Sequence, residues 1–136
     1  MPKNPPWMKA TPTWSSDMST NATIIIQRPG AQEFASIYTH WDGYPSHHGK
    51  ILLENYDTYE KVLELIELGQ LSVLHETPDA CVSYHRWRGE DKNINVSSNL
   101  NDHTDMQYAY LFRDGEWFYK YAGVFRPLTI EACQKD

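Results

Sequence analysis

The sequence predicts an α+β domain in which an antiparallel sheet of about five strands carries two helices on one face. Residues 21–27 (NATIIIQ) are rich in β-branched side chains, as strands are. Residues 59–68 (YEKVLELIEL) have the apolar spacing of an amphipathic helix. Asp114-Gly115, set between two aromatic runs, is typical of a β-hairpin turn. A chain of 136 residues fits one domain built from such elements.

The first expected elements are two strands that pair as a hairpin. Residues 21–27 and 33–39 are separated by Arg28–Gln32, whose Pro-Gly pair favours a turn. In the second strand, alternation places Phe34, Ser36 and Tyr38 on one face and Ala35, Ile37 and Thr39 on the other.

Two helices are expected next. Pro45-Ser46 opens the first, with Ser46 as its N-cap, and Ile51, Leu52 and Tyr56 form its core-facing stripe. Residues 57–60 (DTYE) resemble a capping box that starts the second helix, and Gly69 is its natural end.

The second half of the chain is expected to add three strands, separated by polar segments. The strands are residues 80–85, 107–112 and 116–121. Residues 70–79 and 90–105 are expected to be loops, because they are polar or closed by proline.

The chain divides into a proline-rich N-terminal arm, residues 1–17, and a single domain, residues 18–136. The arm has four prolines, so neither a helix nor a central strand is expected there. It also carries Trp7 and Trp14, whose rings are costly to leave in water. We expect these rings to dock on the domain, on a partner, or on a second copy in a homo-oligomer.

The composition excludes several classes of function. A net charge of −6 argues against a general binder of nucleic-acid backbones. Two cysteines without a C-x-x-C pair predict neither a disulfide scaffold nor a cysteine zinc site. No apolar run approaches the length of a membrane span, and the N-terminal residues do not resemble a signal peptide, so a cytoplasmic protein without a membrane partner is expected.

Residues 40–50 are the first candidate binding site. A strand ends at His40, Asp42-Gly43 supplies a tight turn, with Gly43 expected to take a positive φ, and a helix begins near Pro45. The N-terminus of that helix favours an anion, which Lys50 and the following histidines would help to hold.

The side chains around this turn have two interpretations. In the first, Trp41 and Tyr44 stack on a base while His47 and His48 bind a phosphate or carboxylate. In the second, both rings belong to the core, Asp42 caps the turn, and both histidines face solvent. Gly49 within the first helical turn indicates a close approach, by a ligand or by another strand.

The second candidate site is the segment YHRWRGED, residues 84–91. Strand alternation would place Arg86 and Arg88 on one face, where their guanidinium groups suit a phosphate. The alternative is a pair of salt bridges to Glu90, Asp91 or other surface acids.

Catalysis has less support in the sequence. Zinc or manganese ligand types occur at His40, Asp42, His47, His48 and His85, but without a metal-binding spacing, so no cofactor or metal is expected. None of the serines has a nucleophile-elbow motif, and neither cysteine has an activating neighbourhood.

The segment IYTHWDGYPSHHGKILLENY, followed by KVLELIELGQLSVL and YHRWRGED, resembles a family of small phage and prophage proteins of unassigned function. The shared pattern includes HWDGYP, an LGDLS-like helix end, a Y-x-R-x-RGE segment and a late DGxW hairpin, and it covers residues 22 to about 120. His47-His48 and Trp87 depart from the pattern, which shifts weight to His40, Asp42, Arg86 and Arg88. The resemblance implies a phage-type accessory protein that acts inside a bacterial cell.

Three functions follow as hypotheses. The leading one is a non-catalytic accessory protein that binds a host protein or complex, to blunt a defence or to redirect host machinery. The alternative is a nucleotide- or anion-binding protein that uses residues 40–50 with Arg86 and Arg88. The third is a metal-dependent hydrolase. The residues expected to bind a ligand or partner are His40, Asp42, Tyr44, Lys50, Arg86, Arg88, Trp7 and Trp14.

Overall fold

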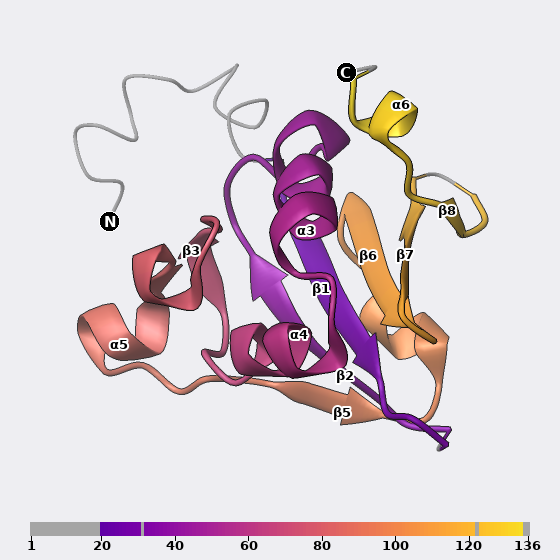
Figure 1. Cartoon of the computed structure of the whole chain (residues 1–136). Helices are drawn as coiled ribbons and strands as arrows, with labels where there is room; N and C mark the ends of the chain where they lie inside the picture. The colour runs from indigo at the N-terminus through magenta and orange to yellow at the C-terminus, as the bar shows by residue number, and fades with distance from the viewer. Residues whose placement is uncertain (1–19, 31, 122, 135–136) are drawn as a thin grey trace, which may run out of the picture.

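The computed structural model describes residues 20–30, 32–121 and 123–134, which form an eight-stranded mixed sheet with helices packed against it (Figure 1). Strand β1 (Ala22–Gln27) lies at the centre of the sheet. It pairs antiparallel with β2 (Phe34–Thr39) on one side and parallel with β6 (Tyr108–Arg113) on the other. The predicted arm, residues 1–17, lies outside the described residues, so Trp7 and Trp14 are not placed.

The remaining strands extend the sheet in both directions. Beyond β2 lie β3 (Leu71–Val73) and β4 (Val82–Ser83), and beyond β6 lie β7 (Glu116–Lys120) and β8 (Arg126–Pro127). Strand β5 (Asn95–Ser97) pairs antiparallel with the first half of β2, while β3 pairs parallel with its last residue. One edge of β2 is therefore shared by two short strands.

Within the described residues, four α-helices accompany the sheet. They are α3 (Lys50–Asn55), α4 (Tyr59–Ile66), α5 (Tyr84–Arg88) and α6 (Ile130–Cys133). A turn of π-helix, η1 (Pro45–Gly49), leads into α3, and two short 3₁₀ segments, η2 (Pro78–Ala80) and η3 (Leu100–His103), lie in the connections. Helices α3 and α4 lie in front of the sheet in Figure 1, while α5 lies beside its β3–β4 side.

The predicted fold class is therefore wrong in two respects. The sheet is mixed rather than antiparallel, because β6 fills the free edge of β1 in a parallel register. In the described part of the chain it has eight strands rather than five, with four α-helices rather than two. The strands β3 and β5 lie in segments expected to be loops; each has three residues, too few for an alternation signal, and each pairs with the edge of β2.

Three local predictions also need correction. Residues 84–88 form a helix rather than the end of a strand, because the Ser83 hydroxyl caps the Arg86 amide and Gly89 ends the turn with a φ of 72°. Helix α4 is capped by Thr58, one residue after the predicted capping box begins. Ser46 is not the N-cap of η1, because the helical turn already begins at Pro45 and Tyr44 holds the N-cap position.

Two predicted hairpins and one helix end are confirmed. Strands β1 and β2 pair antiparallel from Ala22 with Thr39 to Gln27 with Phe34. The β6–β7 hairpin turns at Asp114 and Gly115, with φ values of 54° and 80°, as a type I′ turn requires. Gly69 follows α4 with a φ of 82°.

The main core lies between the sheet and helices α3 and α4. Ile24, Ile26, Leu52, Leu65 and Tyr110 are among its buried side chains. The opposite face of the sheet carries a second, smaller core, in which Leu100, Phe118 and Phe125 pack on Ile25, Phe34, Ala109 and Leu111. Central strand β1 is thus buried on both faces, which accounts for its run of three isoleucines.

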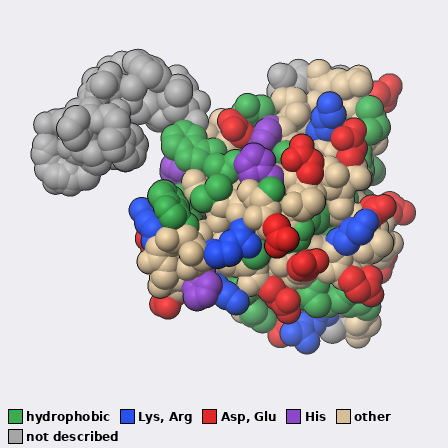
Figure 2. Space-filling model, turned by 60° about the vertical axis from the view of Figure 1, so that its left-hand side comes forward, with side chains coloured by type: hydrophobic (Ala, Val, Ile, Leu, Met, Phe, Trp, Pro, Cys, Tyr) green, Lys and Arg blue, Asp and Glu red, His purple; other side chains and the backbone are tan. Residues whose placement is uncertain are grey.

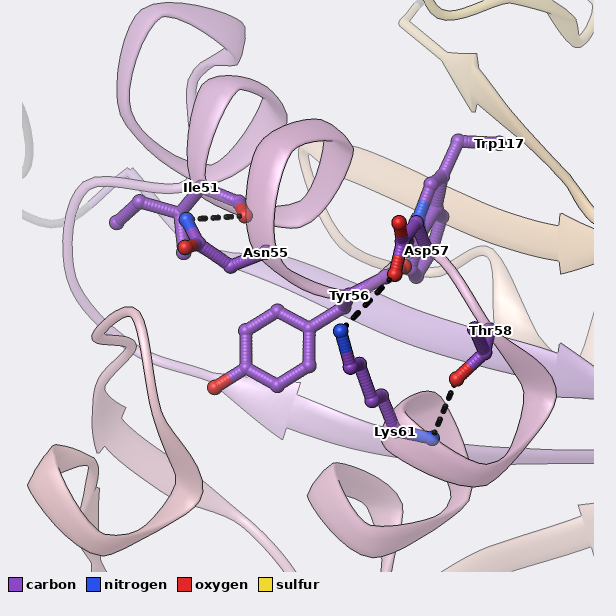
Figure 3. A network of polar contacts seen from close by, with 7 residues as sticks. All are labelled: Ile51, Asn55, Tyr56, Asp57, Thr58, Lys61 and Trp117. Atoms are coloured by element: carbon purple, nitrogen blue, oxygen red, sulfur yellow. Dashed lines mark hydrogen bonds and ion pairs between the residues drawn. The ribbon is translucent and has the colours of Figure 1, made fainter.

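At the junction of α3 and α4, the backbone of Tyr56 is hydrogen-bonded to the sheet (Figure 3). The Trp117 indole Nε1 on β7 donates to the Tyr56 carbonyl at 2.7 Å. On the other side of the junction, the Lys61 amide donates to Thr58 Oγ1 at 3.2 Å and its ammonium pairs with Asp57. The buried hydrogen bond from Trp117 to Tyr56 connects the helical layer to the β6–β7 hairpin.

Candidate functional site

The segment from His40 to Gly49 is built around the carbonyl oxygen of Asp42. Asp42 has a φ of 59°, and this left-handed residue turns the chain from β2 toward η1. Its carbonyl oxygen lies 2.8 Å from His48 Nδ1 and 3.2 Å from His47 Nδ1. Since a carbonyl can only accept, the proton of each ring is assigned to Nδ1. One carbonyl thus aligns two neighbouring imidazoles.

His48 is an internal structural residue. Its side chain is completely buried, and its Nε2 lies 2.7 Å from Thr39 Oγ1 on β2, which donates to it. Burial, reinforced by the neighbouring His47, lowers the pKa of His48 to about 3. The predicted roles for this residue, phosphate ligand or solvent-facing side chain, are both wrong, because its ring is enclosed between β2 and Tyr110.

Gly43 allows the turn to pack directly on the start of β1. A Cβ atom at this position would lie 2.8 Å from both Ala22 Cβ and the Thr20 carbonyl oxygen. The Gly43 amide donates to that Thr20 carbonyl at 2.6 Å, and the Gly43 carbonyl accepts from the Tyr110 hydroxyl at 2.6 Å. The expected positive φ lies at Asp42 instead, so the glycine is required by close packing.

Gly49 also packs closely against other residues of the chain. A Cβ atom there would lie 3.1 Å from Cys133 Sγ and 3.2 Å from a methyl group of Leu128. The close approach is therefore made by helix α6 and the residues before it, and not by the ligand or the further strand that were expected there.

The helix start is poorly suited to an anion. Pro45 has no amide proton, and the amides of His47 and His48 both donate to the Tyr44 carbonyl at 3.0 Å. Lys50 is exposed on α3 and lines a separate hollow of about 420 Å³ with Ser46, Glu54, Ile130, Cys133 and Gln134. The structure therefore does not combine these groups into the predicted anion site.

The polar rim of the turn is formed by His40 and its neighbours. His40 Nδ1 lies 2.6 Å from the Tyr38 hydroxyl, and its ring meets the Trp41 indole edge-on at 4.5 Å between centroids. All three side chains are half-buried, and burial lowers the pKa of His40. Asp42 and Tyr44 complete the rim through a hydrogen bond of 3.1 Å between the Tyr44 hydroxyl and Asp42 Oδ1.

Helix α5 holds a stack of two rings and a guanidinium group. Tyr84 and Trp87 are stacked with their centroids 6.2 Å apart. The guanidinium carbon of Arg88 lies 4.9 Å from the Tyr84 ring and 4.8 Å from the Trp87 ring, and the group also pairs with Glu90 at 2.8 Å. Trp87 is nevertheless 61% exposed. The stack therefore fixes a large apolar side chain in contact with water.

Arg86 does not belong to this stack. Its guanidinium donates to the carbonyl oxygens of Pro78 and Asp79, at 3.1 and 3.4 Å, and to that of Cys81. The prediction that Arg86 and Arg88 share a strand face is wrong, because both are on a helix and point to different partners. Arg86 closes the η2 loop against α5.

The two aromatic groups lie at the same end of the sheet. The amides of His40 and Trp41 donate to the Leu71 and Ser72 carbonyls of β3, and the Tyr84 amide donates to the Gln70 carbonyl just before β3. Burial raises the pKa of Tyr38, and the nearby Tyr84 phenol raises it further. We call the combined set the aromatic surface: Tyr38, His40, Trp41, Tyr84, Trp87 and Arg88.

Figure 2 brings the α5 side of the molecule forward, and hydrophobic side chains gather there beside histidine and basic side chains. Elsewhere on the same view, acidic and basic side chains are interspersed.

Ser36 and His103 form a second buried polar pair, on the opposite face of the sheet from α3. The His103 Nε2 donates to the Ser97 carbonyl at 3.2 Å, so its Nδ1 accepts from the Ser36 hydroxyl at 2.7 Å. Both side chains are 1% exposed, and Ser36 is in the middle of β2. The pair anchors η3 to the sheet.

Sequence reasoning missed the helical stack on α5. Had residues 84–88 been interpreted as a helical turn, the spacing of Tyr84, Trp87 and Arg88 would have placed all three on one face. The available signal was Ser83 as a cap and Gly89 as a stop, in a segment only five residues long.

Two further searches of the described residues gave negative results. No three or more His, Cys, Asp or Glu side chains within residues 20–30, 32–121 and 123–134 gather in a way that would hold a metal ion. In the same ranges, no helix has both the length and the apolar character needed to cross a membrane.

Comparison of the chain with models of protein families, with curated proteins and with solved structures finds no match.

Proposed function

We propose that this chain is a non-catalytic accessory protein of phage type that binds a protein of its bacterial host in the cytoplasm, and that the aromatic surface is where it binds. The observation that carries the proposal is Trp87, which is 61% exposed yet held by Tyr84 and Arg88. An immobilised ring loses little conformational freedom when a partner covers it.

The composition of the surface supports a protein as the partner. Tryptophan, tyrosine and arginine are the residues that most often dominate protein–protein binding energy. Trp87, Tyr84 and Arg88 provide all three within one helical turn, and Trp41 adds a second indole next to His40. A partner that covers this surface would gain apolar burial at its centre and hydrogen bonds from His40 at its rim.

The alternative is nucleotide or anion binding, but the basic residues that it required are engaged elsewhere or lie apart. Arg86 is occupied by three carbonyl oxygens, Arg88 is paired with Glu90, and Lys50 lies in a separate hollow. The geometry therefore favours protein binding over anion binding.

The test is capture from host lysate by three immobilised proteins: wild type, Trp87→Ala and Tyr121→Ala. Tyr121 is a matched control, since it is 52% exposed and stacked on Tyr108, outside the aromatic surface. We expect one stoichiometric host protein on wild type and Tyr121→Ala, with binding to Trp87→Ala weakened by about thirtyfold, the effect of losing about 2 kcal/mol. Equal capture by Trp87→Ala, or no stoichiometric partner in any host tested, would overturn the proposal.

A further inference from the structure

We propose that a hollow beside Tyr38 binds a guanidinium group, and that the partner of the aromatic surface supplies this group as an arginine side chain. The identity of the donor as the partner rests on the proposed function. The site itself, which takes a planar cation, is testable without any partner.

The hollow lies on the face of the sheet opposite α3 and α4, at the point where the second core ends. Phe34, Ser36 and Tyr38 follow one another on that face of β2, and of these three only Phe34 belongs to the second core. The hollow has a volume of about 150 Å³ and is lined by Ser36 and Tyr38, by β5, and by residues between η3 and β6. A cavity of about this volume admits a molecule the size of benzene, and therefore the head group of an arginine.

The charge of the lining favours a cation. Of the described side chains that line the hollow, Asp102 and Asp105 are acidic and none is lysine or arginine. His103 also lines it, but as a neutral ring, because its Nε2 donates to the Ser97 carbonyl while its Nδ1 accepts from the Ser36 hydroxyl. The carboxylates therefore face the hollow without a cation from the lining itself.

Several hydrogen-bond acceptors of the lining are available to a ligand. Within the part of the chain that the structure describes, the side chains of Gln70, Asn93 and Asp105 make no hydrogen bond or ion pair. Asp102 uses one carboxylate oxygen, Oδ2, to accept from the Ser97 hydroxyl at 2.5 Å. Its other oxygen, the Asp105 carboxylate and the two amide oxygens can all accept from a donor-rich group.

The arrangement of these acceptors suits a guanidinium group better than an ammonium group. Gln70 precedes β3, Asn93 precedes β5 and Asp105 precedes β6, so the acceptors approach from three different segments. A guanidinium directs five N–H groups outward in one plane and can satisfy a carboxylate and separate amides together. The Tyr38 ring, held by the 2.6 Å hydrogen bond between its hydroxyl and His40, provides a lining ring of the kind on which guanidinium groups stack.

The hollow adjoins the aromatic surface through two residues. Tyr38 belongs to both. Gln70 contributes its side chain to the hollow, while its carbonyl accepts from the amide of Tyr84 at 3.1 Å. A protein that covers Trp87 and Tyr84 can therefore extend one long side chain into the hollow. Arginine is also among the residues that most often dominate binding energy, which makes it a suitable anchor.

The experiment titrates the ¹⁵N-labelled full chain with Nα-acetyl-arginine amide and follows the side-chain amide signals of Gln70 and Asn93 by NMR. The signals are assigned with the variants Gln70→Glu and Asn93→Asp. We expect both signals to shift with a Kd of about 1 mM. Nα-acetyl-citrulline amide, which has the same shape without the charge, should bind roughly tenfold more weakly. Nα-acetyl-lysine amide should also bind more weakly, by roughly threefold.

Two variants test the carboxylate. Asp105→Asn should weaken binding of the arginine probe by roughly tenfold. Glu64→Gln is the matched control and should leave the affinity unchanged, because Glu64 is exposed on α4, on the other face of the sheet. Equal affinity for the arginine and citrulline probes, or unchanged affinity in Asp105→Asn, overturns the site. A lysine probe that binds as tightly as the arginine probe overturns the assignment to a guanidinium.

The lysate assay then tests whether the partner supplies the arginine. Asp105→Asn should reduce capture of the host protein at least fivefold, whereas Glu64→Gln should not. If Asp105→Asn captures as much as wild type while Trp87→Ala does not, only this inference is overturned. If the arginine probe binds as expected but no variant and no wild-type protein captures a host protein, the proposed function is overturned and the guanidinium site is supported.

Discussion

Thr39 Oγ1 lies 2.7 Å from Nε2 of His48, and both side chains are completely buried. The imidazole accepts a hydrogen bond there and donates its own Nδ1 proton to the Asp42 carbonyl, and its complete burial disfavours the charged form of the ring. A buried neutral histidine makes the fold sensitive to acid.

The free energy of unfolding should therefore fall as the pH falls from 7 to 5. His48 has a pKa near 6.5 in the unfolded chain and about 3 in the folded one. Between these values the unfolded state binds more protons, so stability present above pH 6.5 is lost as the pH decreases. The expected loss from this one group is about 2 kcal/mol between pH 7 and pH 5. Urea unfolding at both pH values measures it.

The control for this prediction is a pair of glutamine variants. His48→Gln should remove most of the pH dependence, whereas His47→Gln, which changes the half-buried neighbour, should retain it. An equal loss of stability on acidification in wild type and His48→Gln would contradict the assignment.

Gly43→Ala should destabilise the fold by about 1–3 kcal/mol, the usual cost of overpacking. The new Cβ would meet Ala22 and the Thr20 carbonyl at 2.8 Å, and the backbone must shift to admit it. Thermal and urea unfolding provide the measurement. Gly123→Ala is the matched control, since a Cβ there lies 3.9 Å from its nearest neighbour. Equal stability of the two variants would show that the turn does not pack on β1 as described.

Tyr110→Phe should cost about 1 kcal/mol, because it leaves the buried Gly43 carbonyl without its 2.6 Å hydrogen bond. Tyr119→Phe removes a hydroxyl from the residue directly opposite on β7 and serves as the control. The difference in unfolding free energy between the two variants isolates the bond to the turn. A Tyr110→Phe protein as stable as the control would contradict it.

Arg86→Ala and Arg88→Ala should affect different properties, the first stability and the second binding. Removing Arg86 should lower stability by about 1 kcal/mol, since three carbonyl oxygens of the η2 loop lose their donor. Removing Arg88 should change stability by less than about 0.5 kcal/mol but weaken capture of the host protein. Melting temperature and the lysate assay separate the two. Loss of capture with Arg86→Ala alone would mean that the roles are reversed.

The sequence predicted most reliably those elements whose signal is local. The β1–β2 hairpin, the β6–β7 hairpin and the end of α4 at Gly69 each follow from a few adjacent residues, and all three are present. The parallel pairing of β1 with β6 was not predictable in this way, because it joins segments far apart in the chain and depends on which edge of β1 remains free.

The candidate site was predicted only in part, because some of its contacts also join segments far apart in the chain. Asp42 does turn the chain, and His40 does lie at the rim, as the order of residues indicated. The burial of His48 depends on Tyr110, and the engagement of Arg86 depends on the η2 loop. Neither contact leaves a trace in the spacing of neighbouring residues.

The parallel register of β1 and β6 also has a consequence for biosynthesis. Ala22 pairs with Tyr108, so β1 leaves the ribosome long before its second neighbour exists. During that interval Ile24, Ile25 and Ile26 form the edge of a nascent hairpin, and an apolar β-branched edge readily recruits strands from other chains. The yield of folded protein should therefore depend on how quickly translation delivers residue 113, and on chaperones that occupy this edge until it does.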